Sequence, residues 1–307
     1  MLRFAGLRIL GAIPALFFVI LVAFLMVRLA PGGPFDDERV LPPETARNLA
    51  AAYHLDEPLP RQFGRYVSGL LCGDLGPSYR YRDYGVSELI AGALPVSLQL
   101  GALALLLALL LGIGAGITAA LTRNSLTDRV VTGLAMAGLS VPVFVVAPLA
   151  VLVFAVYLKW LPASFGADAG VWRYLLPVTT LALPQVGYIA RLIRASLIEV
   201  LGSDYIRTAR AQGLPRATII RRHALKPALL PLVSYLGPAI AAVLTGAVVV
   251  ESIFGIPGLG QLFLRGGLNR DYTLVLGIVV FYAALIVCLN LLVDLIYGAL
   301  DPRIRRR

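Results

Sequence analysis

Long apolar runs alternate with short polar loops along most of the chain. Six runs are long enough to cross a bilayer, which takes about 20 mostly apolar residues per helix. They cover residues 9–27, 95–121, 130–157, 174–190, 228–250 and 273–297. Aromatic residues mark several of their edges, among them Tyr157 and Trp160. The pattern predicts an all-α, polytopic membrane protein with six transmembrane helices.

The first run could belong to a signal peptide, because Arg3 and Arg8 precede it. It is longer than the apolar core of a signal peptide, and no Ala-x-Ala site follows closely. We therefore expect a retained membrane anchor. The predicted organisation is a tail and first helix (1–29), an external segment (30–94), a five-helix core (95–297) with a polar loop at 196–227, and a basic tail (298–307).

The distribution of Lys and Arg predicts the orientation, because cytoplasmic loops carry the excess of both. An internal N-terminus puts most bases inside: Arg3, Arg8, Arg123, Arg129, the eight bases of 191–226, Arg303, Arg305, Arg306 and Arg307. The two short outer loops then hold only Lys159, Arg173, Arg265 and Arg270. Both termini are expected in the cytoplasm of a bacterium, with the chain in its inner membrane. Segment 30–94 is long enough for a small folded external piece.

Composition agrees with a membrane protein. The chain is 59% hydrophobic and 14% charged, with a mean hydropathy of +0.83, whereas soluble domains are about a quarter charged. The net charge of +10 does not indicate nucleic acid, because the bases flank apolar runs instead of forming a patch. We expect the apolar runs to contact membrane lipid. Cys72 and Cys288 are too few for a disulfide framework.

Small residues mark one predicted helix contact. Gly112 and Gly116 form a GxxxG pair, which permits close approach of two helices. This pair fits a bundle packed around a solute pathway and fits ordinary helix packing equally well.

The loop 196–227 is too polar to span and too patterned for a linker. Ser203 and Asp204 offer an N-cap, Gly213 a C-terminal cap and Pro215 a helix start. We predict two short helices joined at 213–215, the second ended by Pro227. Each has an apolar face with arginines interspersed, so the loop could dock in a groove of a soluble partner or rest on anionic lipid.

This loop resembles the EAA loop of permease subunits of binding-protein-dependent ABC importers. Aligned on Gly213, Arg207-Thr208-Ala209 stand where the family has Glu-Ala-Ala, and Pro227 comes one residue late. The loop is closer to the peptide and nickel branch. The matching residues are Arg191, Arg194 and Ser196; Asp204-Tyr205, Thr208-Ala209-Arg210-Ala211 and Gly213-Leu214; and His223-Ala224-Leu225.

The resemblance extends over the whole chain. Residues 28–32 and 251–260 are similar to that branch, and residues 76–78 with Asp83-Tyr84 look like the B-type subunit of oligopeptide importers. The resemblance implies the type I importer permease fold. It also implies oligopeptides as cargo, with dipeptide or nickel systems as alternatives.

In the family, a short cytoplasmic helix couples the permease to an ATPase. The resemblance therefore assigns ATPase coupling to Asp204, Tyr205, Arg207, Thr208, Ala209, Arg210, Gly213, Leu214 and Pro215. It implies four kinds of partner: a second related permease, two ATPase subunits, an external binding protein and the peptide. The chain itself shows no P-loop, and its lysines are Lys159 and Lys226. No enzyme activity, metal or cofactor is expected of it; ATP and Mg²⁺ belong to the ATPases.

Two further sets of residues are candidates on weaker grounds. Glu251, Gly258 and Gly260 could contact the binding protein, and the alternative for Glu251 is an interfacial acid with access to water. Gln99, Gln185, Asn290 and Asp294 could line the pathway or bond to neighbouring helices.

The sequence argues against two other classes of membrane protein. A zinc protease would need His-Glu-x-x-His, but His54 and His223 lie outside the spans and far apart. An ion-coupled secondary transporter would usually show internal repeats or charges at mid-membrane, and neither is evident.

Overall fold

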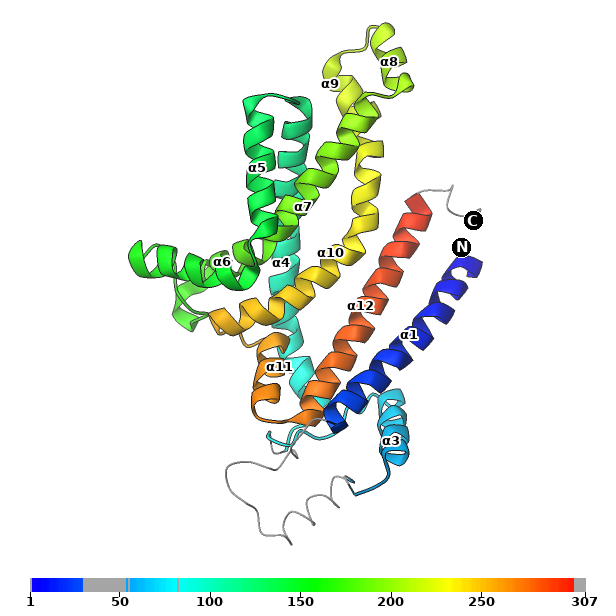
Figure 1. Ribbon diagram of the computed structural model, residues 1–307, viewed down its shortest axis with the longest axis vertical. Coiled ribbons are helices and arrows are strands. Elements are labelled where there is room, and N and C mark those ends of the chain that lie inside the picture. Colours follow the sequence, from blue (N-terminus) through cyan, green and yellow to red (C-terminus); the bar gives the residue numbers. More distant parts are fainter. Residues whose placement is uncertain (1, 30–53, 55, 82, 301–307) are drawn as a thin grey trace. The chain divides into compact units, whose positions relative to one another are not determined.

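The computed structural model describes residues 2–29, 54, 56–81 and 83–300, and their regular structure is helical apart from one isolated antiparallel bridge between Pro77 and Gly85 (Figure 1). Within these described residues, five helices are long and apolar enough to cross a membrane. They are α1 (Leu2–Leu29), α4 (Val86–Leu121), α7 (Leu175–Leu201), α10 (Leu225–Phe254) and α12 (Tyr272–Leu300). The predicted all-α architecture is confirmed. The basic tail from residue 301 onward and much of segment 30–94 lie outside the described residues.

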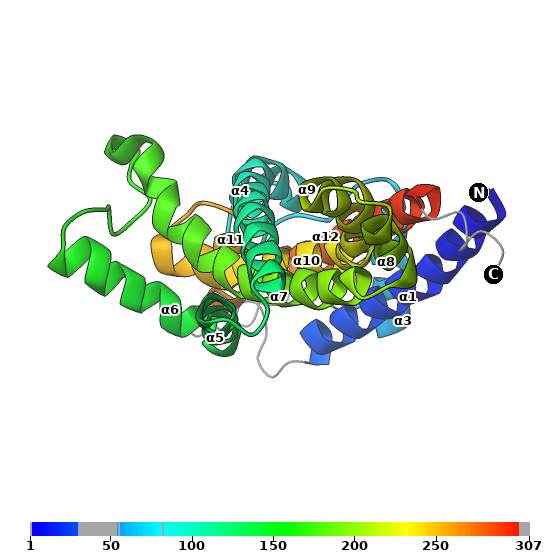
Figure 2. The same ribbon diagram turned by 90° about the horizontal axis from the view of Figure 1, so that it is seen from above.

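The run at 130–157 is not one straight span. It forms α5 (Leu126–Ser140), α6 (Val143–Ala150) and a π-helical segment, Val151–Tyr157, with a bend of 102° between α5 and α6. α6 therefore runs outward from the end of α5 (Figure 2). Proline explains the break, because its ring disfavours helical geometry in the preceding residue. Val141 is accordingly extended (φ −88°, ψ 121°), and Pro142 caps α6. In the part of the chain that the structure describes, the candidate spans number six if this bent pair is counted as one.

Two helix boundaries differ from the prediction, and both involve proline. α4 begins at Val86, so residues 86–94 of the predicted external segment are helical and Pro95 lies inside the helix. Pro227 does not end the second short helix of the loop, because residues from Arg216 to Phe254 form one continuous helical run. A π-helical turn, Ile219–Ala224, precedes that proline. In a π-helical turn the backbone hydrogen bonds span five residues in place of four. This shift helps the helix to continue through Pro227, which has no N–H to donate.

The described chain divides into two compact units. The first comprises residues 97–256 and 289–300, and its centre is α7, which packs against α5 and α10. Ile189, Ile193 and Leu197 of α7 are completely buried. A Cβ atom on Gly112 would lie 2.8 Å from Ile189, and one on Gly116 would lie 2.6 Å from the Ala190 carbonyl oxygen. The predicted close approach at the GxxxG pair is thus confirmed, and its partner is α7.

The second unit comprises residues 2–96 and 257–288. In it, α3 (Leu59–Leu71) packs on α1 through ring contacts of Phe63 with Phe17 and Phe24. A loop before α4 is fixed by the buried carboxylate of Asp271, which accepts hydrogen bonds from the Ser78 hydroxyl and from the backbone N–H groups of residues 79 and 80. This unit also contains the short helix α11 (Leu259–Leu268) and the first part of α12, as far as residue 288.

Candidate functional site

A short helix, α8 (Asp204–Ala211), lies beyond the C-terminal end of α7, beside α9 (Arg216–Thr218) (Figure 1). Ser203 occupies the N-cap position, as predicted. Its hydroxyl nevertheless donates to the Val200 carbonyl oxygen (2.6 Å), so it does not cap α8 with its side chain. Asp204 supplies an acid in the first turn and Arg210 a base in the last, which suits the helix dipole.

The C-terminus of α8 is closed by a Schellman motif. The N–H of Gly213 donates to the carbonyl oxygen of Arg210 (3.0 Å), and that of Leu214 donates to Ala209 (3.3 Å). Gly213 has φ +77°, a left-handed conformation that side chains disfavour. The predicted glycine cap is confirmed, and it turns the chain toward Pro215, the N-cap residue of the next helical run, which begins at Arg216.

One face of α8 is held by its own chain. Ile206 is completely buried and Ala209 is 7% exposed, and both belong to an apolar cluster with Leu197 of α7. The cluster also contains Ala120, Ile219, Ala224 and Ala228. The small side chain of Ala209 thus allows α8 to approach α7 and α10. Ala209 therefore lies on the face that packs against its own chain, and its assignment to ATPase coupling stays a prediction.

The opposite face of α8 is open. Tyr205 is 48% exposed, and Asp204, Arg207, Thr208 and Arg210 are exposed as well. Arg207 Nη1 lies 3.3 Å from Asp204 Oδ1, an exposed pair whose net stabilisation is small. Gly213 and Pro215 are exposed and Leu214 is half-buried. The exposed face of α8 thus presents an aromatic ring, hydroxyl groups and guanidinium groups. These groups can form contacts with another protein.

The three residues considered for a binding-protein contact are largely enclosed. Glu251 of α10 is completely buried, and its carboxylate accepts a hydrogen bond from Ser97 of α4 (2.6 Å). In the second unit, Gly258 is the N-cap residue of α11 and Gly260 lies in its first turn, and both are buried. In this conformation the Glu251 carboxylate joins two helices, so a role in binding another protein stays a prediction.

The candidate pathway residues mostly bond between helices. Gln99 is exposed and accepts a hydrogen bond from the Tyr174 hydroxyl (3.0 Å), whereas Gln185 is buried and accepts one from Tyr235 (2.8 Å). Asn290 packs its side chain directly against Gly237 of α10. Asp294 lies on α12, but its side chain is outside the part of the chain that the structure describes.

An ion pair joins α5 and α7 that was not predicted from the sequence. Arg194 makes two short bonds to Asp128, Nε to Oδ1 (2.6 Å) and Nη2 to Oδ2 (2.8 Å). Asp128 is 3% exposed and also accepts from the N–H of Asn124 (2.9 Å). The Ser-x-x-Asp spacing of Ser125 and Asp128 could have indicated a helix start, but nothing local indicates the arginine 66 positions later.

Within the described residues, no cluster of His, Cys, Asp or Glu could hold a metal ion. The arrangement around α8 offers recognition and mechanical attachment. No group in it is placed as a nucleophile with an adjacent base.

Curated proteins of similar sequence include oligopeptide and dipeptide permeases. The chain is 51% identical over 306 residues to the oligopeptide transport system permease protein OppB of Escherichia coli K12, covering 99% of this chain and 100% of that protein. It is 40% identical over 284 residues to the dipeptide transport system permease protein DppB of Bacillus subtilis, covering 92% of each.

Solved structures confirm the fold. An inward-facing methionine ABC transporter, MetNI, matches with a TM-score of 0.60 at 20% identity, covering 69% of this chain and 96% of that one. Residues 112–306 match the family described as binding-protein-dependent transport system inner membrane component. By this match and by the full-length identity to OppB, the chain belongs to the family of inner-membrane components of binding-protein-dependent transport systems.

Proposed function

We propose that the chain is the transmembrane permease subunit of an ATP-driven importer, and that its cargo is oligopeptides delivered by an external binding protein. The observation that carries the proposal is the 51% identity to OppB over 99% of the chain. Dipeptide import is the second candidate, supported by the 40% identity to DppB over 92% of the chain.

In this proposal α8 is the coupling helix. Its exposed face, centred on Tyr205 and Thr208, binds a cleft of an ATPase subunit, and its buried face transmits the movement. The cluster behind it includes residues of α4, α7 and the start of α10, so displacement of α8 moves three helices together. ATP binding closes the ATPase pair, and the helices then switch between inward-facing and outward-facing packings.

The remaining assignments follow from this role. A second, related permease completes the pathway, two ATPase subunits hold ATP and Mg²⁺, and this chain hydrolyses nothing. The positive-inside distribution supports cytoplasmic termini. The same distribution puts α8 in the cytoplasm, where an ATPase could reach it.

The decisive experiment is purification of the tagged chain from its native membrane, followed by reconstitution with the subunits that accompany it. Uptake of labelled peptides of graded length, with and without ATP, then identifies the cargo. ATP-dependent uptake of peptides longer than two residues is expected, in preference to dipeptides or Ni²⁺. A dipeptide preference would favour the second candidate, and uptake driven by an ion gradient with no ATPase present would refute both.

A further inference from the structure

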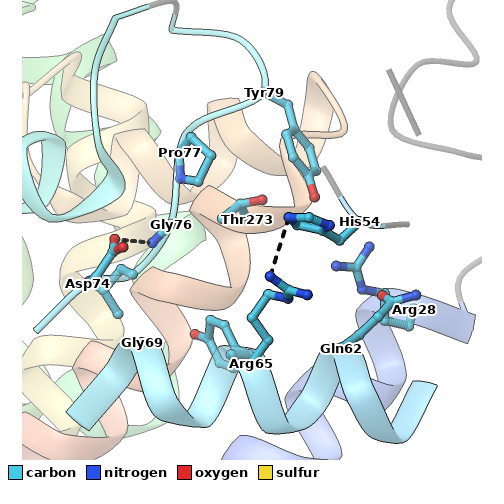
Figure 3. Close-up of a pocket in the computed structure, with 12 residues that line it drawn as sticks. Arg28, His54, Gln62, Arg65, Gly69, Asp74, Gly76, Pro77, Tyr79 and Thr273 are labelled. Atoms are coloured by element: carbon cyan, nitrogen blue, oxygen red, sulfur yellow. Dashed lines mark hydrogen bonds between the residues drawn. The ribbon is translucent and has the colours of Figure 1, made fainter. Parts of the chain in front are cut away.

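A pocket of about 340 Å³ in the second unit belongs to none of the surfaces described above (Figure 3). It lies among the end of α1, helix α3 and the loop before α4, and Thr273 of α12 completes it. Its lining is strongly polar at one end, where Arg28, His54 and Arg65 gather, while Asp74 lies at the other end.

The cations at this end are incompletely neutralised. Arg65 Nη2 contacts Glu57 Oε1 (2.6 Å), and its Nη1 donates to Nε2 of His54 (3.4 Å). Arg28 lies over the ring of Phe24, 5.6 Å from its centroid, and no acidic side chain of the described residues pairs with it. The Glu57 carboxylate is thus engaged by Arg65, and the guanidinium of Arg28 adds positive charge at this end of the pocket, away from Asp74, whose carboxylate accepts from the N–H of Gly76. A guanidinium in this position suits an anion.

Tyr66 adds a buried donor to the same pocket. Its hydroxyl is shielded from solvent and has no hydrogen-bond partner among the described residues. A buried polar group without a partner is costly, so such a group commonly indicates a missing ligand or water. Burial raises the pKa of the Tyr66 hydroxyl, which keeps it protonated and able to donate to an anionic oxygen.

The position of the pocket favours a lipid over a soluble anion. Arg28 lies in the last turn of α1, at the end of the apolar stretch Leu10–Leu29, where a span meets the headgroups. Met26 and Leu29 beside it are 70% and 69% exposed, so acyl chains can cover them. Helix α3 is amphipathic, with Phe63 and Val67 packed toward α1, as expected of a helix lying in the interface.

We propose that this pocket binds the phosphate headgroup of an anionic phospholipid. Arg28 and Arg65 hold the phosphate oxygens, the Tyr66 hydroxyl donates to one of them, and the acyl chains lie along the exposed end of α1. The bound lipid ties α3 to the first span. The proposal is independent of which solute the protein carries.

Native mass spectrometry of the full-length chain tests the proposal. The chain is reconstituted in nanodiscs of equal phosphatidylglycerol and phosphatidylcholine, and the retained lipids are counted after release. Wild type is expected to retain phosphatidylglycerol in at least several-fold preference. Arg28→Gln should abolish the preference, and Arg28→Lys, which keeps the charge, should restore most of it.

Arg61→Gln is the matched control, because Arg61 is an exposed base on α3 that does not line the pocket. It should behave as wild type. Equal retention of both lipids by wild type, or an unchanged preference in Arg28→Gln, would overturn the proposal. A separate experiment adds inorganic phosphate to the chain in phosphatidylcholine nanodiscs. The assignment to lipid would be overturned if wild type bound phosphate, Arg28→Gln did not, and wild type showed no lipid preference in the first experiment. Thermal melting of each variant verifies folding.

Discussion

Gly213 offers a sharp test of how α8 is held in place. Its φ of +77° lies in the left-handed region, and a Cβ atom there would meet nothing within 4 Å. Replacement by alanine therefore changes backbone energy alone and leaves the surrounding packing untouched. The substitutions Gly213→Asn, Gly213→Ala and Gly213→Pro separate the energy of the left-handed backbone conformation from that of the hydrogen bond between the Gly213 N–H and Arg210.

The expected cost rises along this series. A left-handed conformation costs an L-residue about 1–2 kcal/mol, and less for asparagine. Proline cannot adopt positive φ, and it also removes the N–H that donates to Arg210, which adds about 0.5–1.5 kcal/mol. An increment of about 1.4 kcal/mol changes the ratio of docked to undocked α8 about tenfold. Gly213→Ala should thus weaken docking measurably, and Gly213→Pro should largely abolish it.

The assay compares ATP hydrolysis with peptide uptake in reconstituted vesicles. If α8 couples the two, uptake should fall in the order Asn, Ala, Pro, while substrate no longer stimulates hydrolysis. The number of peptides imported per ATP is the informative quantity, because it falls only when the two processes separate.

Gly202 provides the matched control on the other side of α8. Its φ is −86°, and a Cβ atom would make ordinary contacts at 3.4 and 3.7 Å. Gly202→Ala should therefore leave the coupling ratio unchanged. Equal ratios for wild type and Gly213→Pro would refute the argument that this turn maintains coupling.

Three other predictions concern helix contacts. Gly116→Val should destabilise the α4–α7 contact by about 1–3 kcal/mol through overpacking, as measured by thermal melting, whereas Gly114→Val, where a Cβ meets nothing within 4 Å, should not. Ile206→Ala removes a completely buried side chain and should cost about 2–5 kcal/mol; a wild-type melting temperature and uptake would contradict the docked position of α8. Asp128→Asn and Arg194→Gln should each lower the melting temperature by a few degrees, and the double variant by less than their sum; additive effects would show that the pair does not interact.

Much of the fold could be predicted because some features depend on short stretches of sequence alone. A membrane span needs an apolar run that matches the bilayer thickness, and a helix end needs particular residues within one turn. The five long spans follow from apolar length, and the end of α8 follows from Gly213, whose left-handed conformation favours glycine. The GxxxG pair likewise identified a contact face, since close packing requires residues without side chains.

Proline was the main source of error, because its effect depends on the neighbouring turns. Pro142 breaks a span, whereas Pro95 lies within α4 and Pro227 follows a π-helical turn without ending the helix. All three occur in apolar or helical patterns that look alike in one dimension. Proline has no N–H, so the carbonyl oxygen one turn earlier loses its usual hydrogen-bond donor. Whether a helix continues through proline depends on whether nearby groups can donate to that oxygen in its place.

Contacts between distant positions could not be predicted at all. The pairs Asp128–Arg194 and Ser97–Glu251 are separated by 66 and 154 positions, and each joins two helices. A polar residue in an apolar run predicts that some partner exists, since an unpaired group there is costly. It does not say which helix supplies the partner, and for that reason Gln99 and Gln185 could be assigned only to a pathway or a helix contact.

The departure from the family pattern at position 207 becomes understandable from the two faces of α8. Ala209, where the pattern has a small residue, lies in the cluster against α7 and α10, so the fold itself restricts it. Arg207, where the pattern has glutamate, is exposed, and its ion pair with Asp204 is a weak surface pair. Folding therefore places little restriction on the side chain at 207. If α8 docks on an ATPase, the charge at this position must be complementary to that subunit, and an arginine here requires an acidic or neutral surface opposite it.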